Sequence, residues 1–194
     1  MPSNHIVTNM RTPRKPLQES LYEYDDYKEA VDQALDYSLQ LYGGAEYAEL
    51  AVLLGFLRAL GIMHQSHHWQ TKGDPFFGDH LLYERLYSEV VEEIDALGER
   101  AVGVGGPALT NYFIQLEHIK TYLKACTKGA ALYEESLRAE ISFLIAGELV
   151  MERLDNQGIL TRGIEQAIGN IMDVHESHIY LLQQRNRAAE FEKE

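Results

Sequence analysis

Apolar side chains recur every three or four residues along most of this 194-residue chain, which is the spacing of amphipathic α-helices. Glycine and proline interrupt the pattern and divide the chain into separate helical segments. The segments predicted in this way are 20–42, 45–70, 79–102, 111–126, 130–154 and 160–187. The pattern therefore indicates an all-α protein.

Four of these segments are long enough to form a four-helix bundle. The turns at 72–75 and 156–158 are short, so each is predicted to join two antiparallel neighbours. The connection at about 103–129 is longer and contains the segment 111–126, which predicts a crossover that carries a short helix. The predicted divisions are an N-terminal arm at 1–19, an extra amphipathic helix at 20–44, the bundle at 45–187 and a frayed tail at 188–194.

Two histidines flank the first short turn. His68 is predicted to end one long helix and His80 to begin the next, with Asp79 as the N-cap of the second helix. Because the turn makes the two helices antiparallel, we expect both imidazoles at the same end of the hairpin. Imidazole is a common ligand of first-row transition metals, so the pair is a candidate metal site.

Asp95 and Glu99 lie further along the second helix of this hairpin. At about 1.5 Å per residue, Asp95 lies roughly 22 Å along the helix axis from His80, too far for both to bind one ion within a single chain. Two interpretations remain open. Either the two pairs are unrelated, or a second copy of the chain, related by a two-fold axis across this helix, brings the acids to the histidines.

A helical wheel separates two stripes on the segment 79–102. The apolar stripe is predicted to face the core and comprises Tyr83, Leu86, Val90, Ile94 and Leu97. The polar stripe lies about 130° away and comprises His80, Glu84, Asp95 and Glu99. A solvated acidic face is the usual role of such residues, and an interface with a second copy is the alternative.

Over about forty residues, this part of the chain resembles the Dps family, the mini-ferritins that protect DNA in starved cells. The matching pattern comprises His68-Trp69, a Gly-x-x-Phe turn from Gly73 to Phe76, His80, an Asp-x-x-small-Glu-Arg run from Asp95 to Arg100, and Gly105-Gly106. The extra helix at 20–44 departs from the plainer N-terminus of most members of that family.

The resemblance implies a ferritin-like bundle and a ferroxidase centre shared between two-fold-related subunits. The residues that match its ligands are His68 and His80 from one subunit and Asp95 and Glu99 from the other. Glu84 and Trp69 are expected beside these ligands. The resemblance also implies iron, no organic cofactor, oxidation of Fe(II) by hydrogen peroxide or dioxygen, and a ferric mineral inside a twelve-subunit shell that protects against oxidative damage.

Three further histidines, His64, His175 and His178, are predicted on inward helical faces near one end of the bundle. No histidine in the chain has a glutamate three residues before it, so the Glu-x-x-His pattern of an in-bundle di-iron centre is absent. Inward histidines more commonly form hydrogen bonds within the core, here with Tyr83 or Tyr133. A second metal site is the alternative.

The formal net charge is −13, and a polyanionic protein attracts cations and repels nucleic acid. The basic segment is the N-terminal arm, which contains Arg11, Arg14 and Lys15. Three positive charges support only weak, salt-sensitive DNA binding. A structural or DNA-compacting protein with little ferroxidase activity is the alternative to iron oxidation.

The chain has one cysteine, Cys126, so no disulfide can form within it, and a cytoplasmic location is expected. The N-terminus contains no apolar run of signal-peptide length. The most apolar stretch, 51–63, is too short to span a membrane. Near the last turn, three acids are candidates to line a pore: Glu152, Asp155 and Glu165.

Overall fold

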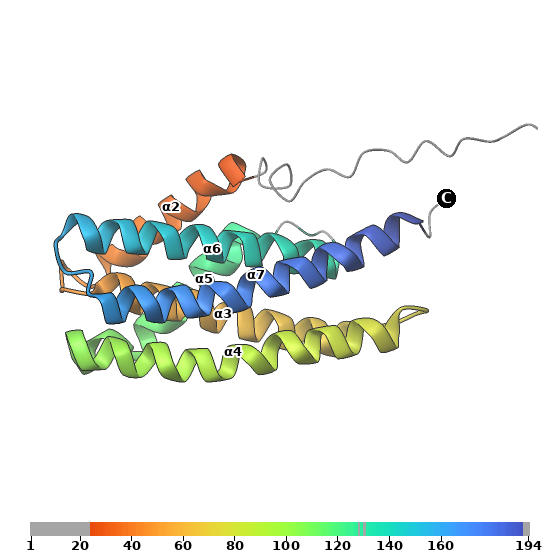
Figure 1. Cartoon of the computed structure of the whole chain (residues 1–194), viewed down its shortest axis with the longest axis horizontal. Helices are drawn as coiled ribbons and strands as arrows, with labels where there is room; N and C mark the ends of the chain where they lie inside the picture. The colour runs from red at the N-terminus through yellow and green to blue at the C-terminus, as the bar shows by residue number, and fades with distance from the viewer. Residues whose placement is uncertain (1–23, 128, 130, 192–194) are drawn as a thin grey trace, which may run out of the picture.

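The structure is a computed structural model, and it describes residues 24–127, 129 and 131–191. Four long helices lie side by side in Figure 1: α3 (Ala48–Gln70), α4 (Phe76–Gly105), α6 (Leu132–Asn156) and α7 (Arg162–Phe191). α3 packs against α4 and α6, and α7 packs against the same two helices, so the four close into a ring. The predicted all-α bundle of ferritin-like topology is confirmed.

The crossover between α4 and α6 contains a 3-10 turn, η2 (Pro107–Thr110), and the short helix α5 (Tyr112–Cys126). The side chain of Asn111 caps α5, because it accepts hydrogen bonds from the backbone N–H groups of Phe113 and Ile114 at 3.0 and 3.3 Å. α5 packs closely on α3 at Gly55, where a Cβ atom would lie 2.4 Å from the Cβ of His118. Only glycine permits this approach.

α3 is the central helix of the fold. It contacts α2, α4, α5 and α6, and its side chains from Leu50 to Leu57 are all completely buried. By length and composition it would pass for a membrane span, but 78% of its most apolar window is buried inside the protein. Its apolar character is therefore explained by the helices that surround it.

Helix α2 (Tyr24–Gln40) crosses the outside of the bundle and contacts α6 and α5 (Figure 1). Its own side chains Val31 and Leu35 are buried. Arg153 of α6 reaches Asp32 at 2.6 Å and Asp36 at 2.7 Å. The extra helix predicted before the bundle is therefore present from Tyr24, and residues 20–23 lie outside the described part of the chain.

Helices α4 and α7 differ in extent from the prediction. α4 begins at Phe76, with Pro75 at its N-cap position, so the prediction of Asp79 as N-cap was wrong. Asp79 instead accepts hydrogen bonds from Nε and Nη2 of Arg185 on α7, at 2.5 and 3.3 Å. α7 continues to Phe191, so the segment from 188, which was predicted to be frayed, is helical that far.

The sequence pattern places Leu137, Ile141, Leu144, Glu148 and Met151 on one face of α6. Ile141 is buried and the other three apolar residues pack partly buried against the core, but Glu148 is exposed. The buried residues also include Ser136, Ala139, Glu140, Phe143 and Val150. α6 contacts α2, α3, α5 and α7, and a helix with apolar neighbours on several sides has no single apolar stripe.

Candidate metal sites

The turn between α3 and α4 brings His68 and His80 together, as the hairpin predicted. Their rings are stacked, with centroids 3.7 Å apart. Nδ1 of His68 lies 2.9 Å from the backbone oxygen of His80, and Nδ1 of His80 lies 3.2 Å from that of His68. A ring nitrogen that faces a carbonyl oxygen is the donor, so the proton is on Nδ1 and the lone pair of each Nε2 is available to a metal.

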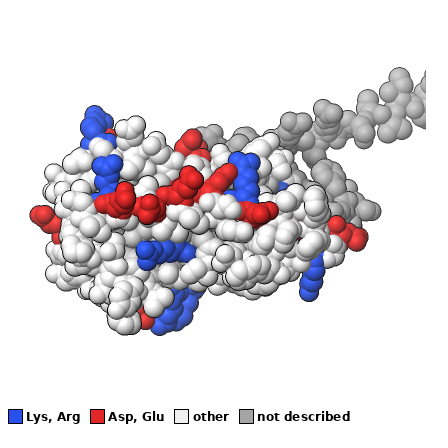
Figure 2. Space-filling view, turned by 90° about the horizontal axis from the view of Figure 1, so that it is seen from below, with Lys and Arg blue, Asp and Glu red and all other residues white. Residues whose placement is uncertain are grey.

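The carboxylates of Asp95 and Glu99 do not reach this pair within one chain. Both side chains are exposed on α4, and the helix rise places Asp95 roughly 22 Å from His80. Figure 2, which views the molecule from the α4 side, shows acidic side chains in a row along this face. Whether a second subunit joins the acids to the histidines stays a prediction.

Large apolar side chains are exposed on the two helices of this hairpin. Val91 and Leu81 are 61% and 48% exposed on α4, and Ile62 and Trp69 are 47% and 70% exposed on α3. Trp69 therefore does not fill the turn of its own chain. Glu84 is exposed on the same stripe. A face that mixes acids with exposed apolar groups is more typical of an interface than of a purely solvated surface.

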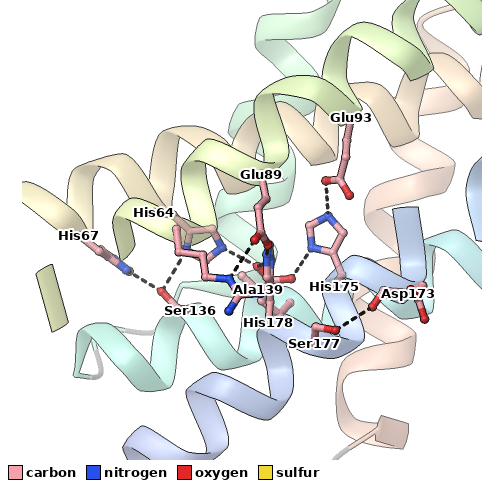
Figure 3. Close-up of polar contacts among 12 residues, drawn as sticks. His64, His67, Glu89, Glu93, Ser136, Ala139, Asp173, His175, Ser177 and His178 are labelled. Carbon is pink, nitrogen blue, oxygen red and sulfur yellow. Dashed lines mark hydrogen bonds and ion pairs between the residues drawn. The ribbon is translucent and has the colours of Figure 1, made fainter. Parts of the chain in front are cut away.

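A second group of side chains lies inside the bundle: Figure 3 shows His64, His175 and His178 near one another, and Glu140 of α6 contacts all three. Glu140 Oε1 lies 2.6 Å from Nε2 of His64 on α3 and 3.3 Å from Nδ1 of His178 on α7. Glu140 Oε2 lies 2.5 Å from Nδ1 of His175. All four side chains are completely buried. We call His64, Glu140, His175 and His178 the buried cluster.

Each histidine of the buried cluster has a polar partner on its outer nitrogen. Nε2 of His178 lies 2.7 Å from Oε2 of Glu89, and Nε2 of His175 lies 3.2 Å from Oε2 of Glu93. Nδ1 of His64 lies 3.3 Å from the hydroxyl of Ser136, which also contacts Nδ1 of His67 at 2.8 Å.

The electrostatics of the buried cluster favour charged groups. Burial would raise the pKa of Glu140, but His175, His178 and His64 outweigh it and hold that pKa well below its usual range. Burial would lower the pKa of His175, but Glu140 and Glu93 raise it to about 9. The pKa of His178 is raised for the same reason, whereas burial lowers the pKa of His64. When no ion is bound, Glu140 is thus ionised and His175 carries a proton at neutral pH.

A surface groove of about 460 Å³ lies between α4 and α7, next to the buried cluster. Its lining includes Glu92, Glu93, Arg100 and Asn170. Glu93 lines the groove, and its carboxylate contacts His175. Both oxygens of that carboxylate are buried, so Glu93 lies between the groove and the buried cluster.

The sequence pattern indicated the three histidines of this cluster but not their carboxylate. The Glu-x-x-His pattern concerns an acid on the same helix as the histidine, whereas Glu140 comes from a different helix. Tyr83 and Tyr133 were the expected partners, and the structure gives all three histidines the common partner Glu140. To predict that residues of these three helices meet, one would have to know that the side of α6 that carries Glu140 is buried.

Two other predicted groups have different outcomes. Arg11, Arg14 and Lys15 lie outside the described residues. Glu152, Asp155 and Glu165 line one surface hollow of about 560 Å³ together with Arg162, which pairs with Glu165 at 2.8 Å. Their role in a pore stays a prediction.

Comparison with known proteins gives several relatives, although no family model matches the chain. The chain is 27% identical over 121 residues to the DNA protection during starvation protein of Brevibacillus brevis, covering 60% of this chain and 77% of that protein. It is 31% identical over 100 residues to general stress protein 20U of Bacillus subtilis, covering 50% and 68%. A match of 57 residues, 37% identical, to the nutrient stress-induced DNA-binding protein of a Nostoc strain covers 29% and 31%.

Proposed function

The chain belongs to the Dps family, and on this premise we propose that it binds and oxidises Fe(II) at sites shared between two subunits. The observation that carries the proposal is the pair His68 and His80. Their Nδ1 atoms are held by backbone carbonyls, and neither Nε2 atom has a hydrogen-bond partner within residues 24–127, 129 and 131–191. Two preoriented imidazoles are half of a metal site.

The other half comes from the α4 face of a second subunit. When two copies of α4 cross in antiparallel fashion near Ser88, His80 of one lies close to the level of Asp95 and Glu99 of the partner subunit. His80 lies 8 residues before that point, and the two acids lie 7 and 11 residues after it. Ser88 is small and exposed, which permits a close crossing. Val91, 61% exposed in the single chain, is buried by the same contact.

The site suits iron as a substrate. Two imidazoles and two carboxylates form a mixed nitrogen and oxygen donor set without thiolate, which binds Fe(II) and, through its carboxylates, stabilises the higher charge of Fe(III). In the proposed reaction two Fe(II) ions each lose one electron, and one hydrogen peroxide takes up both electrons with two protons to give two waters. Dioxygen is the alternative oxidant. The ferric product is stored inside a shell of two-fold dimers, for which we propose twelve subunits.

The direct test is peroxide-driven iron oxidation, followed by ferric absorbance, in the double variant Asp95→Asn with Glu99→Gln. We expect rapid ferric formation in the unchanged protein and its loss in the variant, with the assembly mass unaltered. Glu92→Gln is the matched control, because it removes one exposed carboxylate from the same helix without touching the proposed site. Equal rates in the double variant and the control would refute the proposal.

DNA binding is the second candidate function. Two of the relatives carry names that refer to DNA, and the chain has a basic arm with Arg11, Arg14 and Lys15. The net charge of −13 opposes binding to a polyanion. We therefore propose DNA contact at low ionic strength as a secondary property, carried by the arm.

A further inference from the structure

We propose that the buried cluster binds a divalent first-row transition metal ion inside each subunit, independently of the site shared between subunits. The donors are Nε2 of His64, Nδ1 of His175, Nδ1 of His178 and a carboxylate oxygen of Glu140. They come from three helices, and the three nitrogens surround the Glu140 carboxylate in the core of the bundle; the three histidines are labelled in Figure 3.

The distances within the cluster fit an ion at its centre. One ligand atom from each of Glu140, His175 and His178 can be chosen so that all three lie within 4.8 Å of one another. Two ligands of a tetrahedral ion, each about 2.1 Å from it, lie about 3.4 Å apart. The histidine nitrogens now lie 2.5, 2.6 and 3.3 Å from the Glu140 oxygens. Each nitrogen would therefore need to move away from its Glu140 oxygen by less than about 1 Å to admit the ion. His64, which lies outside that group of three, would also need to approach the other two histidines.

The outer contacts of the histidines are those that metal-bound imidazoles make. A histidine that binds a metal through one nitrogen usually donates the N–H of its other nitrogen to a carboxylate or another acceptor, which fixes the ring orientation. Glu89 has this position for His178, Glu93 for His175 and the hydroxyl of Ser136 for His64. Three rings are thus each held between the same centre and a separate outer partner.

One of these outer contacts is incomplete, and it lies beside the groove. Nε2 of His175 and Oε2 of Glu93 are 3.2 Å apart but lack the direction of a hydrogen bond, so both Glu93 oxygens and this nitrogen have no hydrogen-bond partner in the described chain. The His175 side chain is completely buried, and Glu93 is 11% exposed. Buried polar atoms in this condition indicate a ligand that would reorient them.

The donor set determines the class of ion. Three imidazoles and one carboxylate suit Fe(II), Zn(II), Co(II) or a similar ion, whereas Mg(II) and Ca(II) prefer ligand sets made of oxygen. The ion would reach the cluster from the groove between α4 and α7, where Glu93 lines the groove and its buried carboxylate contacts His175.

The test uses Co(II) as the probe and the full-length protein with His68→Ala and His80→Ala, which removes the surface pair. Co(II) per chain is measured by elemental analysis after gel filtration, and visible absorption reports imidazole ligation. We expect one Co(II) per chain in this background and its loss on adding Glu140→Gln. Adding Glu93→Gln should weaken Co(II) binding about 10-fold to 100-fold, whereas Glu92→Gln, a neighbour that lines the same groove, should leave it unchanged.

Two results would overturn the proposal: no Co(II) in the background protein, or Co(II) binding that Glu140→Gln and Glu93→Gln leave as strong as Glu92→Gln does. The first result means that the centre holds protons rather than metal, and the second means that Co(II) binds to surface acids. If Glu140→Gln prevents folding, judged by helical circular dichroism, the comparison of Glu93→Gln with Glu92→Gln decides the question. The outcome is independent of iron oxidation at the surface pair.

Discussion

A site that takes its histidines from one subunit and its acids from another can be rebuilt from two inactive chains. One parent carries His68→Ala and His80→Ala, and the other carries Asp95→Asn and Glu99→Gln. Each parent alone has no complete site. In a mixed dimer, the intact histidines of the second chain face the intact acids of the first, so one of the two sites is complete.

The size of the recovery follows from this geometry. If equal amounts of the two chains pair at random, half of the dimers are mixed, and each has one complete site out of two. About a quarter of all sites are then active, and the initial rate of peroxide-driven ferric formation should be about a quarter of the rate of the unchanged protein. Neither parent should exceed the rate of iron and peroxide in buffer.

The assay requires the two chains to be produced together, because preformed dimers would not exchange during the measurement. Mass measurement confirms that the parents and the mixture form the same assembly. A mixture as inactive as its parents would show that the acids and histidines do not meet across a subunit contact. Substantial activity in either parent would show that one pair suffices.

Three further outcomes are expected. Leu35→Ala should lower the free energy of unfolding by about 2–5 kcal/mol, because Leu35 is completely buried. Arg153→Met should lower it by less than about 1 kcal/mol, because its partners Asp32 and Asp36 are half exposed. Urea denaturation of the two variants measures both changes. Burial lowers the pKa of His118 to about 4 from an ordinary value of 6.5, so the unfolded chain takes up the extra proton between these pH values. His118 therefore favours unfolding as pH falls from 6.5 to 4, by up to on the order of 3 kcal/mol, and His118→Gln should flatten a plot of stability against pH in that window. In gel-shift assays the full chain should retard DNA only at low salt, and removal of residues 1–18 should abolish the shift; an equal shift without the arm would contradict this assignment.

Helices whose apolar residues face one way were predictable from the sequence. α7 contacts α6 and α4, and the apolar residues at helical spacing along it are buried together with His175 and His178: Ile164, Ile168, Ile171 and Leu182. On α4, four of the five residues of the predicted apolar stripe are buried, and Ile94 is partly buried. Periodicity reports a single buried face well, and both helices have one.

The several buried sides of α6 explain why the buried cluster was recognised only in part. Buried residues lie on more than one side of this helix. The apolar stripe read from the sequence therefore omits Glu140, which reads as an ordinary polar residue. Glu140 is separated by 76 residues from His64 and by 35 from His175, so no local spacing connects them. The surface pair was visible because its histidines lie on both sides of one short turn.

A contribution to folding stability does not by itself account for the buried cluster. An ionised carboxylate gains little from burial even when it is paired, because desolvation offsets most of the attraction. Around Glu140 the described chain provides histidines rather than lysine or arginine, so without a metal the core must hold protons to balance the charge. An apolar residue at 140 would pack in the core without that requirement. A bound cation removes the difficulty, because it replaces the protons and uses the lone pairs of all three imidazoles.

If Glu140 serves packing alone, Glu140→Leu should raise stability both in the presence and in the absence of metal ions. If it binds an ion, Zn(II) should stabilise the unchanged protein and have no effect on the variant, which thermal unfolding with and without a chelator would distinguish.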